Sequence, residues 1–467
     1  MEQFLFVLGR NWKLSLSELD ICLRSTPFKG KIVDYSSNIA IVEFDELLND
    51  EFYVDKLEIL QYYLGGIQKI AKISDFISFL TLKKSFPIKA IRYNEIKKER
   101  QKIKEILNTI LDDIFPNIKN ENIFFATSIY PNLYDDVYYK EVIIKHFLPF
   151  LNTGISKILK EKGATKALYY KYPQKNIDSG NLNPIFPHHV IKYQLLKPHR
   201  AEIIFGITEE GIYLGRTFTT DDPNFKKKID EERPKREFKS AISPKLSIIM
   251  LNFLNLFKNR KEKKILDPFV GNGTIALFGL IEDFQMYGSD IKKKKVLNTI
   301  QNIKWALNEL ELPQIPNIDQ KFKVVDIKNL SKEFKEEFFD GIVTEPDLGP
   351  FFKERPYYTD GIELVETRLQ PLYENIFKQA YKVLKSKSRI CLVAPVISVL
   401  DDSHDLRMEI EAMAINNNFK PIPLITAKRI INKSNRILQF NKSKIFSIMD
   451  AKKGQIIKRK LYLFEKE

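Results

Sequence analysis

The sequence Ile-Leu-Asp-Pro-Phe-Val-Gly-Asn-Gly-Thr, at residues 265–274, predicts the fold of the C-terminal half of this chain. Its first two residues are apolar and indicate a short buried strand that ends on Asp267. Gly271 and Gly273 indicate a turn, and the apolar residues 275–281 indicate a helix. A strand, a glycine turn and a helix form the first unit of a doubly wound α/β fold, in which ligands bind at the carboxyl ends of the strands.

The residues after this unit alternate between expected strands and expected helices. Such alternation predicts a mostly parallel sheet with helices on both faces. The last two expected strands lie on either side of a lysine-rich connection, which is typical of a hairpin that adds an antiparallel edge. The expected strands are 265–266, 285–288, 322–325, 341–343, 389–394, 420–426 and 456–464, and the expected helices are 274–283, 294–310, 331–337, 364–384 and 406–416.

The N-terminal half reads as two smaller α/β units. Residues 3–73 show the order strand, helix, strand, strand, helix, strand, which predicts a two-layer ferredoxin-like unit. Ser15, followed three residues later by Glu18, predicts a capping box at the start of the first helix. The second unit has a long expected helix at 96–114, strands at 122–129, 165–172, 189–196, 201–207 and 211–218, and a helix at 138–162 with a break near 149–153.

The chain has 467 residues, which is too long for one typical domain. Residues 219–243 are polar, charged and without periodicity, so they read as a linker. Pro244 suits the first turn of the helix expected from 245 to 257. The predicted division is a ferredoxin-like domain at 1–82, an RNA-binding α/β domain at 83–218, the linker at 219–243 and the doubly wound domain at 244–467.

The charge of the chain favours a polyanionic partner. There are 75 Lys and Arg residues against 60 Asp and Glu residues, a formal net charge of +15, and nucleic acid is the first candidate. A lysine-rich proteome would give the same excess without any such partner. Basic residues gather near the start of the helix at 96–114, where a solvated helix face is the alternative to RNA contact. The candidate RNA contacts are Lys97, Lys98, Arg100 and Lys102.

Cysteine content and hydropathy indicate a cytoplasmic protein. Cys22 and Cys391 are the two cysteines, and they provide neither a disulfide framework nor a zinc cluster, so no metal site is expected. The longest apolar run, 246–257, is interrupted by Ser and Asn and is too short to span a bilayer. The N-terminus lacks a basic start and reads as a strand, not as a signal peptide. A monomer without membrane contact is expected.

Acids follow four successive expected strands, at Asp267, Asp290, Asp326 and Glu345. In an open parallel sheet these strand ends line one crevice, so the acids predict a ligand rich in hydroxyls and amines. Helix capping by ordinary strand-end acids is the alternative. A nicotinamide dinucleotide would also suit the glycine turn, but Asp267 stands four residues before Gly271 and repels a pyrophosphate.

S-adenosylmethionine fits this set of acids better, because it has an ammonium group, a ribose diol and an adenine amine but no phosphate. Asp267 is expected at the ammonium group, Asp290 at the ribose hydroxyls and Asp326 at the adenine amine. At the fourth strand end, Glu345 and the carbonyl of Pro346 are placed to accept the hydrogens of an exocyclic base amine, whose lone pair is delocalised into the ring. A plain turn at this loop is the alternative reading.

The pattern Asp-Pro-Phe-x-Gly-x-Gly-Thr, with an acid-Pro motif after the fourth strand, resembles the class I methyltransferases that modify base amines. The basic N-terminal half, Arg233-Pro234 and Ser-Pro-Lys-Leu at 243–246 resemble the THUMP-containing tRNA guanosine-10 N2-methyltransferases. This resemblance implies a THUMP-like unit at 83–218, tRNA as partner and formation of N2-methylguanosine. It implies a catalytic loop of Glu345, Pro346 and Asp347, and cofactor contacts at Asp267, Phe269, Gly271, Gly273, Thr274, Asp290, Ile291, Asp326 and Ile327.

The catalytic loop departs from the family pattern. The family reads Asp-Pro-Pro-Tyr where this chain reads Glu345-Pro346-Asp347-Leu348, so the aromatic that would stack on a flipped base is missing. Asp347 adds a carboxylate that either has a raised pKa or faces water. Two alternatives follow: methylation of adenine N6 in DNA or of ribosomal RNA, and a tRNA-binding protein with impaired catalysis. Aromatics that could replace the missing ring are Phe351, Phe352, Tyr357 and Tyr358.

Overall fold

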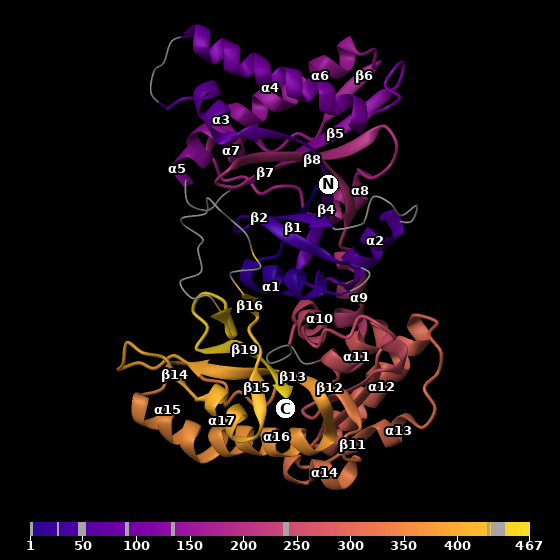
Figure 1. Ribbon diagram of the computed structural model, residues 1–467, viewed down its shortest axis with the longest axis vertical. Helices are drawn as coiled ribbons and strands as arrows, with labels where there is room; N and C mark the ends of the chain where they lie inside the picture. Colours follow the sequence, from indigo (N-terminus) through magenta and orange to yellow (C-terminus); the bar gives the residue numbers. More distant parts are fainter. Residues whose placement is uncertain are drawn as a thin grey trace.

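The computed structural model describes residues 3–25, 28–44, 53–88, 93–131, 136–236, 242–426, 430 and 444–467. Two large sheets follow one another along the long axis of the molecule, the N-terminal sheet at one end and the C-terminal sheet at the other (Figure 1). The N-terminal sheet has eight strands and the C-terminal sheet has nine.

The first four strands have the order β2-β3-β1-β4 and pair antiparallel throughout, which is the arrangement of a ferredoxin-like unit. Their alternation of buried apolar residues places one face on the helices α1 and α2. The elements are β1 (Gln3–Leu8), α1 (Trp12–Cys22), β2 (Gly30–Tyr35), β3 (Ile39–Phe44), α2 (Tyr53–Tyr63) and β4 (Ile67–Ser78).

Strand β4 continues the same sheet into the second unit. It pairs along its length with β8, and the order goes on as β8-β7-β5-β6. The boundary predicted at residue 82 therefore does not interrupt the sheet, and the division into domains stays a prediction. The further elements are α3 (Phe79–Ser85), α4 (Tyr93–Ile114), β5 (Asn122–Tyr130), α5 (Asp136–Tyr138), the π-helix η2 (Tyr139–Phe147), α6 (Leu148–Glu161), β6 (Lys166–Tyr169), α7 (Gln174–Asp178), α8 (Pro187–Lys192), β7 (Arg200–Ile207) and β8 (Gly211–Thr220).

Three local predictions for this half are wrong. The strand expected at 189–196 is replaced by helix α8, which Pro187 starts at its first position. The break expected near 149–153 is absent, because the π-helix η2 runs directly into α6, and the change from one to the other places Pro149 in the first turn of α6. The capping box is absent too: α1 begins at Trp12, before Ser15, and Glu18 instead accepts hydrogen bonds from other backbone amides.

The predicted linker contains a helix, α9 (Pro223–Glu232). Asp222 caps it by accepting from the amides of Asn224 and Phe225, and Pro223 occupies its first turn. Residues 237–241 of the linker lie outside the described residues. The segment after β8 is therefore ordered by the same Asp-Pro pattern that starts many helices.

The C-terminal sheet has the order β11-β10-β9-β12-β13-β19-β15. Strands β9 to β13 pair parallel and β19 pairs antiparallel with β13, which confirms the predicted doubly wound sheet with an antiparallel hairpin. Strand β19 lies inside the sheet, because β15 pairs with its other side. The strands are β9 (Lys264–Asp267), β10 (Gln285–Asp290), β11 (Phe322–Val324), β12 (Phe339–Thr344), β13 (Leu384–Ile397), β14 (Leu406–Arg407), β15 (Phe419–Pro421), β16 (Ile425–Thr426), β17 (Lys444–Ile445), β18 (Ser447–Asp450) and β19 (Ile457–Lys466).

Some of the C-terminal helices differ from the predicted ones. The helix expected at 364–384 starts earlier, at Tyr358, and has a π-helical turn within it. The helix expected at 406–416 begins at Ile410, because Leu406 and Arg407 pair with β13 instead. The helices are α10 (Pro244–Phe253), η3 (Arg260–Glu262), α11 (Thr274–Ile281), α12 (Lys293–Glu309), α13 (Ile318–Lys321), η4 (Ile327–Asn329), α14 (Leu330–Glu333), α15 (Tyr358–Leu364), η5 (Val365–Leu369), α16 (Gln370–Val383) and α17 (Ile410–Asn416).

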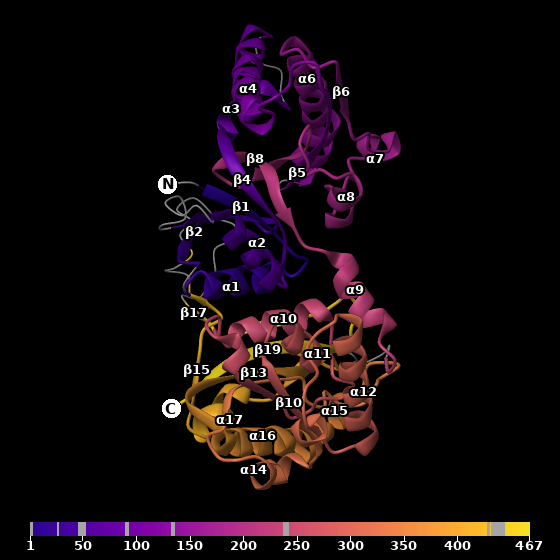
Figure 2. The same cartoon turned by 90° about the vertical axis from the view of Figure 1, so that its right-hand side faces the viewer.

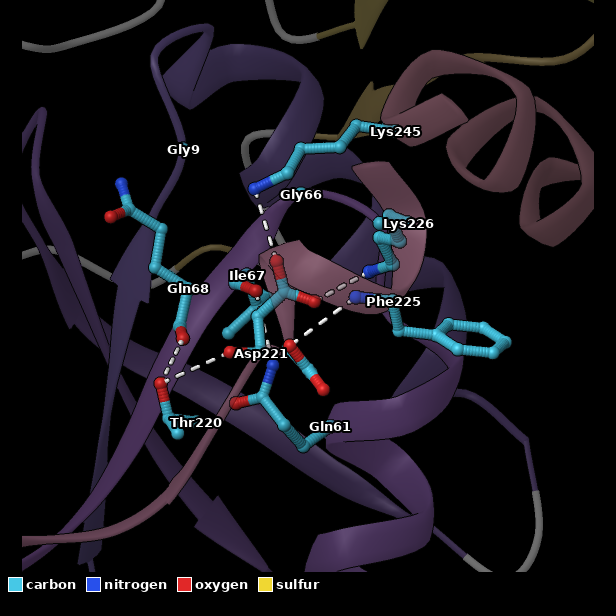
Figure 3. A network of polar contacts seen from close by, with 12 residues as sticks. Gly9, Gln61, Gly66, Ile67, Gln68, Thr220, Asp221, Phe225, Lys226 and Lys245 are labelled. Atoms are coloured by element: carbon cyan, nitrogen blue, oxygen red, sulfur yellow. Dashed lines mark hydrogen bonds and ion pairs between the residues drawn. The ribbon is translucent and has the colours of Figure 1, made fainter. Parts of the chain in front are cut away.

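One apolar core joins the two halves, since the same buried cluster contains residues of β1, α1, α10 and β9. At the junction, Lys226 and Lys245 both bind the buried carboxylate of Asp221, at 2.6 and 3.1 Å (Figure 3). Nearby, the buried carboxylate of Glu18 accepts from Asn252 of α10 at 2.7 Å. The halves are therefore held by buried polar pairs as well as by apolar contact.

Candidate active site

The register of the parallel strands brings the predicted acids to one edge of the sheet. Asp267 at the end of β9 is opposite Gly288 of β10, and Asp290 is opposite Val324 of β11. On the other side, Leu266 is opposite Ile342 of β12, shortly before Glu345. The carboxyl ends of these four strands thus border one region, as the topology requires.

The glycine turn has the left-handed backbone that its glycines allow. Gly271 and Gly273 have φ of +54° and +83°. A Cβ on Gly273 would lie 2.8 Å from the Thr299 side chain, so no larger residue fits there. A Cβ on Gly271 would meet nothing closer than 3.9 Å, so there is open space beside the turn. A ligand can approach the backbone on that side.

Asp290 organises this turn. Its Oδ2 accepts from the amide of Gly271 at 3.1 Å and its Oδ1 accepts from the amide of Lys292 at 2.9 Å. The side chain is half-buried, and the neighbouring Ile291 is 63% exposed, an apolar surface beside a carboxylate. This pairing of groups fits a nucleoside, with hydroxyls on the carboxylate and a base on the apolar side chain.

Asp267 lies beneath the turn and is 1% exposed. Its Oδ1 accepts from the hydroxyl of Thr344 at 2.8 Å and from the amide of Phe269 at 3.1 Å. Burial raises the pKa of Asp267 to about 7, with the two hydrogen bonds acting against it. Phe269 itself is half-buried and packs on the apolar cluster beside α16. Asp267 therefore ties β9 to β12, and its contact with an ammonium group stays a prediction.

The other predicted cofactor residues have different environments. Asp326 is half-buried and caps the turn after β11 by accepting from the amide of Lys328 at 2.9 Å. Ile327 is 7% exposed and belongs to an apolar core cluster. The side chain of Ile327 is therefore enclosed by protein, and a contact of this residue with the cofactor stays a prediction.

The linker is attached to the glycine turn, a relationship that sequence reasoning missed. Arg233 donates to the hydroxyl of Thr274 at 2.8 Å, and its side chain is fully buried. Asn302 of α12 bonds the backbone of Lys235 on one side and the carbonyl of Asn272 on the other, at 2.8 Å. The turn is thus held from behind by the chain that leads in from the N-terminal half.

Glu345 follows β12, and its side chain is 11% exposed. Arg459 of β19 binds both of its oxygens: Nη2 donates to Oε1 at 2.8 Å, and Nε lies 3.2 Å from Oε1 and 3.1 Å from Oε2. Burial raises the pKa of Glu345, and Arg459 opposes that effect. Arg459 was not among the predicted site residues, because it is separated from Glu345 by 114 positions.

Asp347 was expected either to have a raised pKa or to face water, and its side chain is 38% exposed, beside the exposed side chain of Arg368. One oxygen accepts from the amide of Gly349 at 3.1 Å, and the other binds Arg368. Leu348 is half-buried against the core. Phe352 is half-buried and packs against a core cluster. Phe351, Tyr357 and Tyr358 are exposed by 76%, 57% and 40%.

The candidate RNA-binding residues lie on α4, at the end of the molecule away from the C-terminal sheet (Figure 2). Lys97 and Lys98 are exposed. Arg100 is half-buried, donates to the carbonyl of Ser85 at 3.0 Å and lies over the ring of Phe86 at 4.6 Å, and its contact with RNA stays a prediction. Lys102 is half-exposed and bonds Glu99 within the same helix.

Metal-ligand groups and membrane-spanning helices are both absent from the described residues. Within the ranges given above, no three His, Cys, Asp or Glu side chains group as metal ligands. No helix in the described part of the chain is long and apolar enough to cross a membrane.

Comparisons with known proteins give one sequence relative and distant structural neighbours. No family model matches the chain. Over 96 residues, 21% of this chain, it is 35% identical to a protein of Methanothermococcus thermolithotrophicus described as a probable tRNA (guanine(10)-N2)-dimethyltransferase. The match spans 57% of that relative.

Two solved structures align over nearly the whole chain. TrmN from Thermus thermophilus has a TM-score of 0.46 at 13% identity, covering 100% of both chains. A possible methylase from Clostridium difficile 630 has a TM-score of 0.42 at 13% identity, covering 100% of this chain and 99% of the other. Both TM-scores are below 0.5, so the fold assignment rests on the strand order described above.

Proposed function

We propose that this chain is an S-adenosylmethionine-dependent methyltransferase that acts on an amino group of a nucleic-acid base. The observation that carries the proposal is the strand-end arrangement of Asp267, Asp290 and Glu345 around an open glycine turn. The cofactor, when bound, supplies the electrophilic methyl group. The chain supplies acceptors for its hydroxyls and amines.

The preferred substrate is guanine N2 in tRNA. The match to a protein described as a probable tRNA (guanine(10)-N2)-dimethyltransferase supports this choice, as does the net charge of +15. Lys97 and Lys98 of α4 are free to meet a phosphate backbone, since both are exposed. The N-terminal half is proposed to bind tRNA and the C-terminal half to carry out transfer in the cytoplasm.

At the catalytic loop, the residues act on the base and not on the methyl group. Glu345 and the carbonyl of Pro346 accept the two hydrogens of the amine, which fixes its orientation and raises electron density on nitrogen as the new bond forms. The proton leaves the amine after transfer and passes to Glu345 or to water. Exposed aromatics near the loop, Phe351 or Tyr357, stack on the base in place of the family tyrosine.

A tRNA-binding protein with impaired catalysis is the second candidate. It is favoured by one observation: both carboxylates of the loop, Glu345 and Asp347, are already in ion pairs with arginines. The same sheet acting on adenine N6 of DNA or on ribosomal RNA is a further alternative, because the strand-end acids recognise the cofactor and not the base.

One assay distinguishes these functions. The purified chain is incubated with labelled S-adenosylmethionine and bulk tRNA, and the nucleosides of the product are separated. Labelled N2-methylguanosine is expected. Labelled N6-methyladenosine, or transfer to DNA or ribosomal RNA alone, would support the alternative substrates. Binding of cofactor and tRNA without transfer to any of these nucleic acids would support the impaired binder.

A further inference from the structure

The guanidinium of Arg459 and the carboxylate of Glu345 form a two-pronged contact at the catalytic loop. Both oxygens of Glu345 and two nitrogens of Arg459 take part, at 2.8 to 3.2 Å. The two side chains are 11% and 20% exposed. A planar fork of donors on a carboxylate fixes the plane of that carboxylate as well as its position, which a single hydrogen bond does not do.

The contact leaves acceptor capacity on Glu345. An ionised carboxylate has about four lone-pair sites, and an arginine that binds side-on occupies about two of them. The remaining lone pairs face away from Arg459. They can accept the hydrogens of an exocyclic amine, and their direction is set by the fork. The ion pair is thus compatible with a role for Glu345 in catalysis.

Arg459 projects from a rigid element. Strand β19 pairs along its whole length with β13, where Arg459 is opposite Pro395, and its other side is paired with β18. In that second pairing Arg459 is opposite Asp450, a second acid beside the guanidinium. Asp450 in turn accepts from Asn11 of the N-terminal half at 3.1 Å. The arginine is therefore fixed by strand pairing and flanked by two carboxylates.

We propose that Arg459 is a positioning residue of the methyl transfer: it aims the carboxylate of Glu345 at the amine of the target base. This inference rests on the proposed function. This role requires the planar guanidinium of Arg459 and not only its positive charge. A lysine at this position would supply one point charge without fixing the plane of the carboxylate. With this role for Arg459, Glu345 can form an ion pair and still act in catalysis.

The electrostatic surroundings of Glu345 support the same role. Arg459 from β19 and Asp450 from β18 act on Glu345, and Glu345 in turn raises the pKa of Asp267 on β9 and of Tyr373 on α16. Arg459 is the cation that lowers the pKa of Glu345 against burial and Asp450. Loss of Arg459 would therefore shift the acid limb of the pH–rate profile to higher pH.

The test compares Arg459→Gln, Arg459→Lys, Glu345→Gln and the double variant Glu345→Gln/Arg459→Gln in methyl transfer to tRNA. For Arg459→Gln we expect a kcat about tenfold to hundredfold lower, KM values for tRNA and cofactor within about threefold, and an acid limb at higher pH. Arg459→Lys should recover only part of kcat. The double variant should be no slower than Glu345→Gln, since a residue that acts through Glu345 adds nothing once Glu345 is replaced.

Lys458→Gln is the matched control. Lys458 lies next to Arg459 on β19 and also forms an ion pair, with Asp405 at 2.6 Å, away from Glu345. It should keep the wild-type kcat. In Arg459→Gln the buried carboxylate of Glu345 has lost its cation, which can unfold that variant. The double variant has no such carboxylate, so its comparison with Glu345→Gln remains valid even if Arg459→Gln unfolds.

The outcomes separate this inference from the proposed function. A wild-type chain that methylates tRNA together with an Arg459→Gln variant of unchanged kcat would overturn the role of Arg459 alone. The same holds if the double variant is much slower than Glu345→Gln, which would show that Arg459 acts independently. Absence of transfer by the wild-type chain to any nucleic acid would overturn the proposed function and, with it, this inference.

Discussion

Thr344 donates a hydrogen bond to Asp267 across the first and fourth strand ends of the C-terminal sheet, at 2.8 Å. The acid is buried and its pKa is about 7, against an ordinary value of 3.8. The folded protein therefore holds a proton on Asp267 at pH values where the unfolded chain has lost it. The contact joins the strand before the glycine turn to the strand before the catalytic loop. The titration of Asp267 also makes the stability of the fold depend on pH.

The first prediction concerns that pH dependence. Because the folded-state pKa of Asp267 is raised, its contribution makes the free energy of unfolding fall as pH rises from about 4 to about 7. Asp267→Asn keeps the acceptor oxygen and removes the titration. Over this pH range, the free energy of unfolding of the variant should fall by about 2 to 4 kcal/mol less than that of the wild-type chain. Urea unfolding at pH 5 and pH 8 measures the free energy of unfolding of both proteins. An equal change between the two pH values in the wild-type chain and in the variant would contradict a raised pKa of Asp267.

The second prediction concerns Asp290, which holds the turn and is expected to bind the ribose. Asp290→Ala should weaken cofactor binding by about tenfold to a hundredfold, because it removes a charged acceptor, and should leave tRNA affinity unchanged. Calorimetry with the cofactor and filter binding with tRNA measure the two affinities. Asp402→Ala is the control, since Asp402 also caps a loop amide, that of His404. An equal fall in tRNA affinity would contradict the division of roles between the halves.

The third prediction separates crowding from backbone strain at the glycine turn. Gly273→Ala forces a Cβ to within 2.8 Å of Thr299 at a φ of +83°, whereas Gly454→Ala has a similar φ of +79° and open space. Both should cost about 1 kcal/mol for the backbone. Only Gly273→Ala should also abolish cofactor binding, as measured by calorimetry. Similar cofactor affinities in the two variants would show that the turn tolerates a side chain.

The fourth prediction concerns the buried ion pair of Arg260 and Glu282, with Arg260 lying 3.9 Å over the ring of Tyr63. Arg260→Leu should destabilise the fold by about 3 to 5 kcal/mol, because it leaves Glu282 buried without its cation. Arg260→Leu/Glu282→Leu should recover much of this loss. Thermal and urea unfolding measure both variants, and additive losses in the double variant would show that the ring contact dominates.

Periodic features of the sequence were enough to predict the C-terminal sheet. Apolar strands that end on acids and a glycine turn after the first are local signals, and the parallel order follows from the alternation with helices. The same local patterns failed where another local signal competed. Pro187 started a helix in place of an expected strand, and Asp222 with Pro223 started one inside an expected linker. Asp222 and Pro223 are adjacent in the sequence, so the second signal is a local one as well.

The pairs that complete the candidate site could not be predicted in this way. Arg459 and Glu345 are 114 positions apart, and Glu18 and Asn252 are 234 apart. No periodicity relates such residues, because their contact depends on how complete elements pack. Glu18 shows the consequence: a local capping pattern suggested one set of partners, and tertiary packing gave it Gly65, Gly66 and Asn252 instead.

The attachment of Arg233 and Lys235 to the glycine turn has a consequence for the modularity of the chain. A protein cut at residue 244, the predicted start of the C-terminal domain, would lose Arg233 and Lys235, which bond Thr274 and Asn302 from behind. The C-terminal sheet of this shortened protein would be complete, but its glycine turn would lack these hydrogen bonds. The support of the glycine turn therefore begins upstream of the C-terminal sheet, within the segment that the sequence presented as a connector.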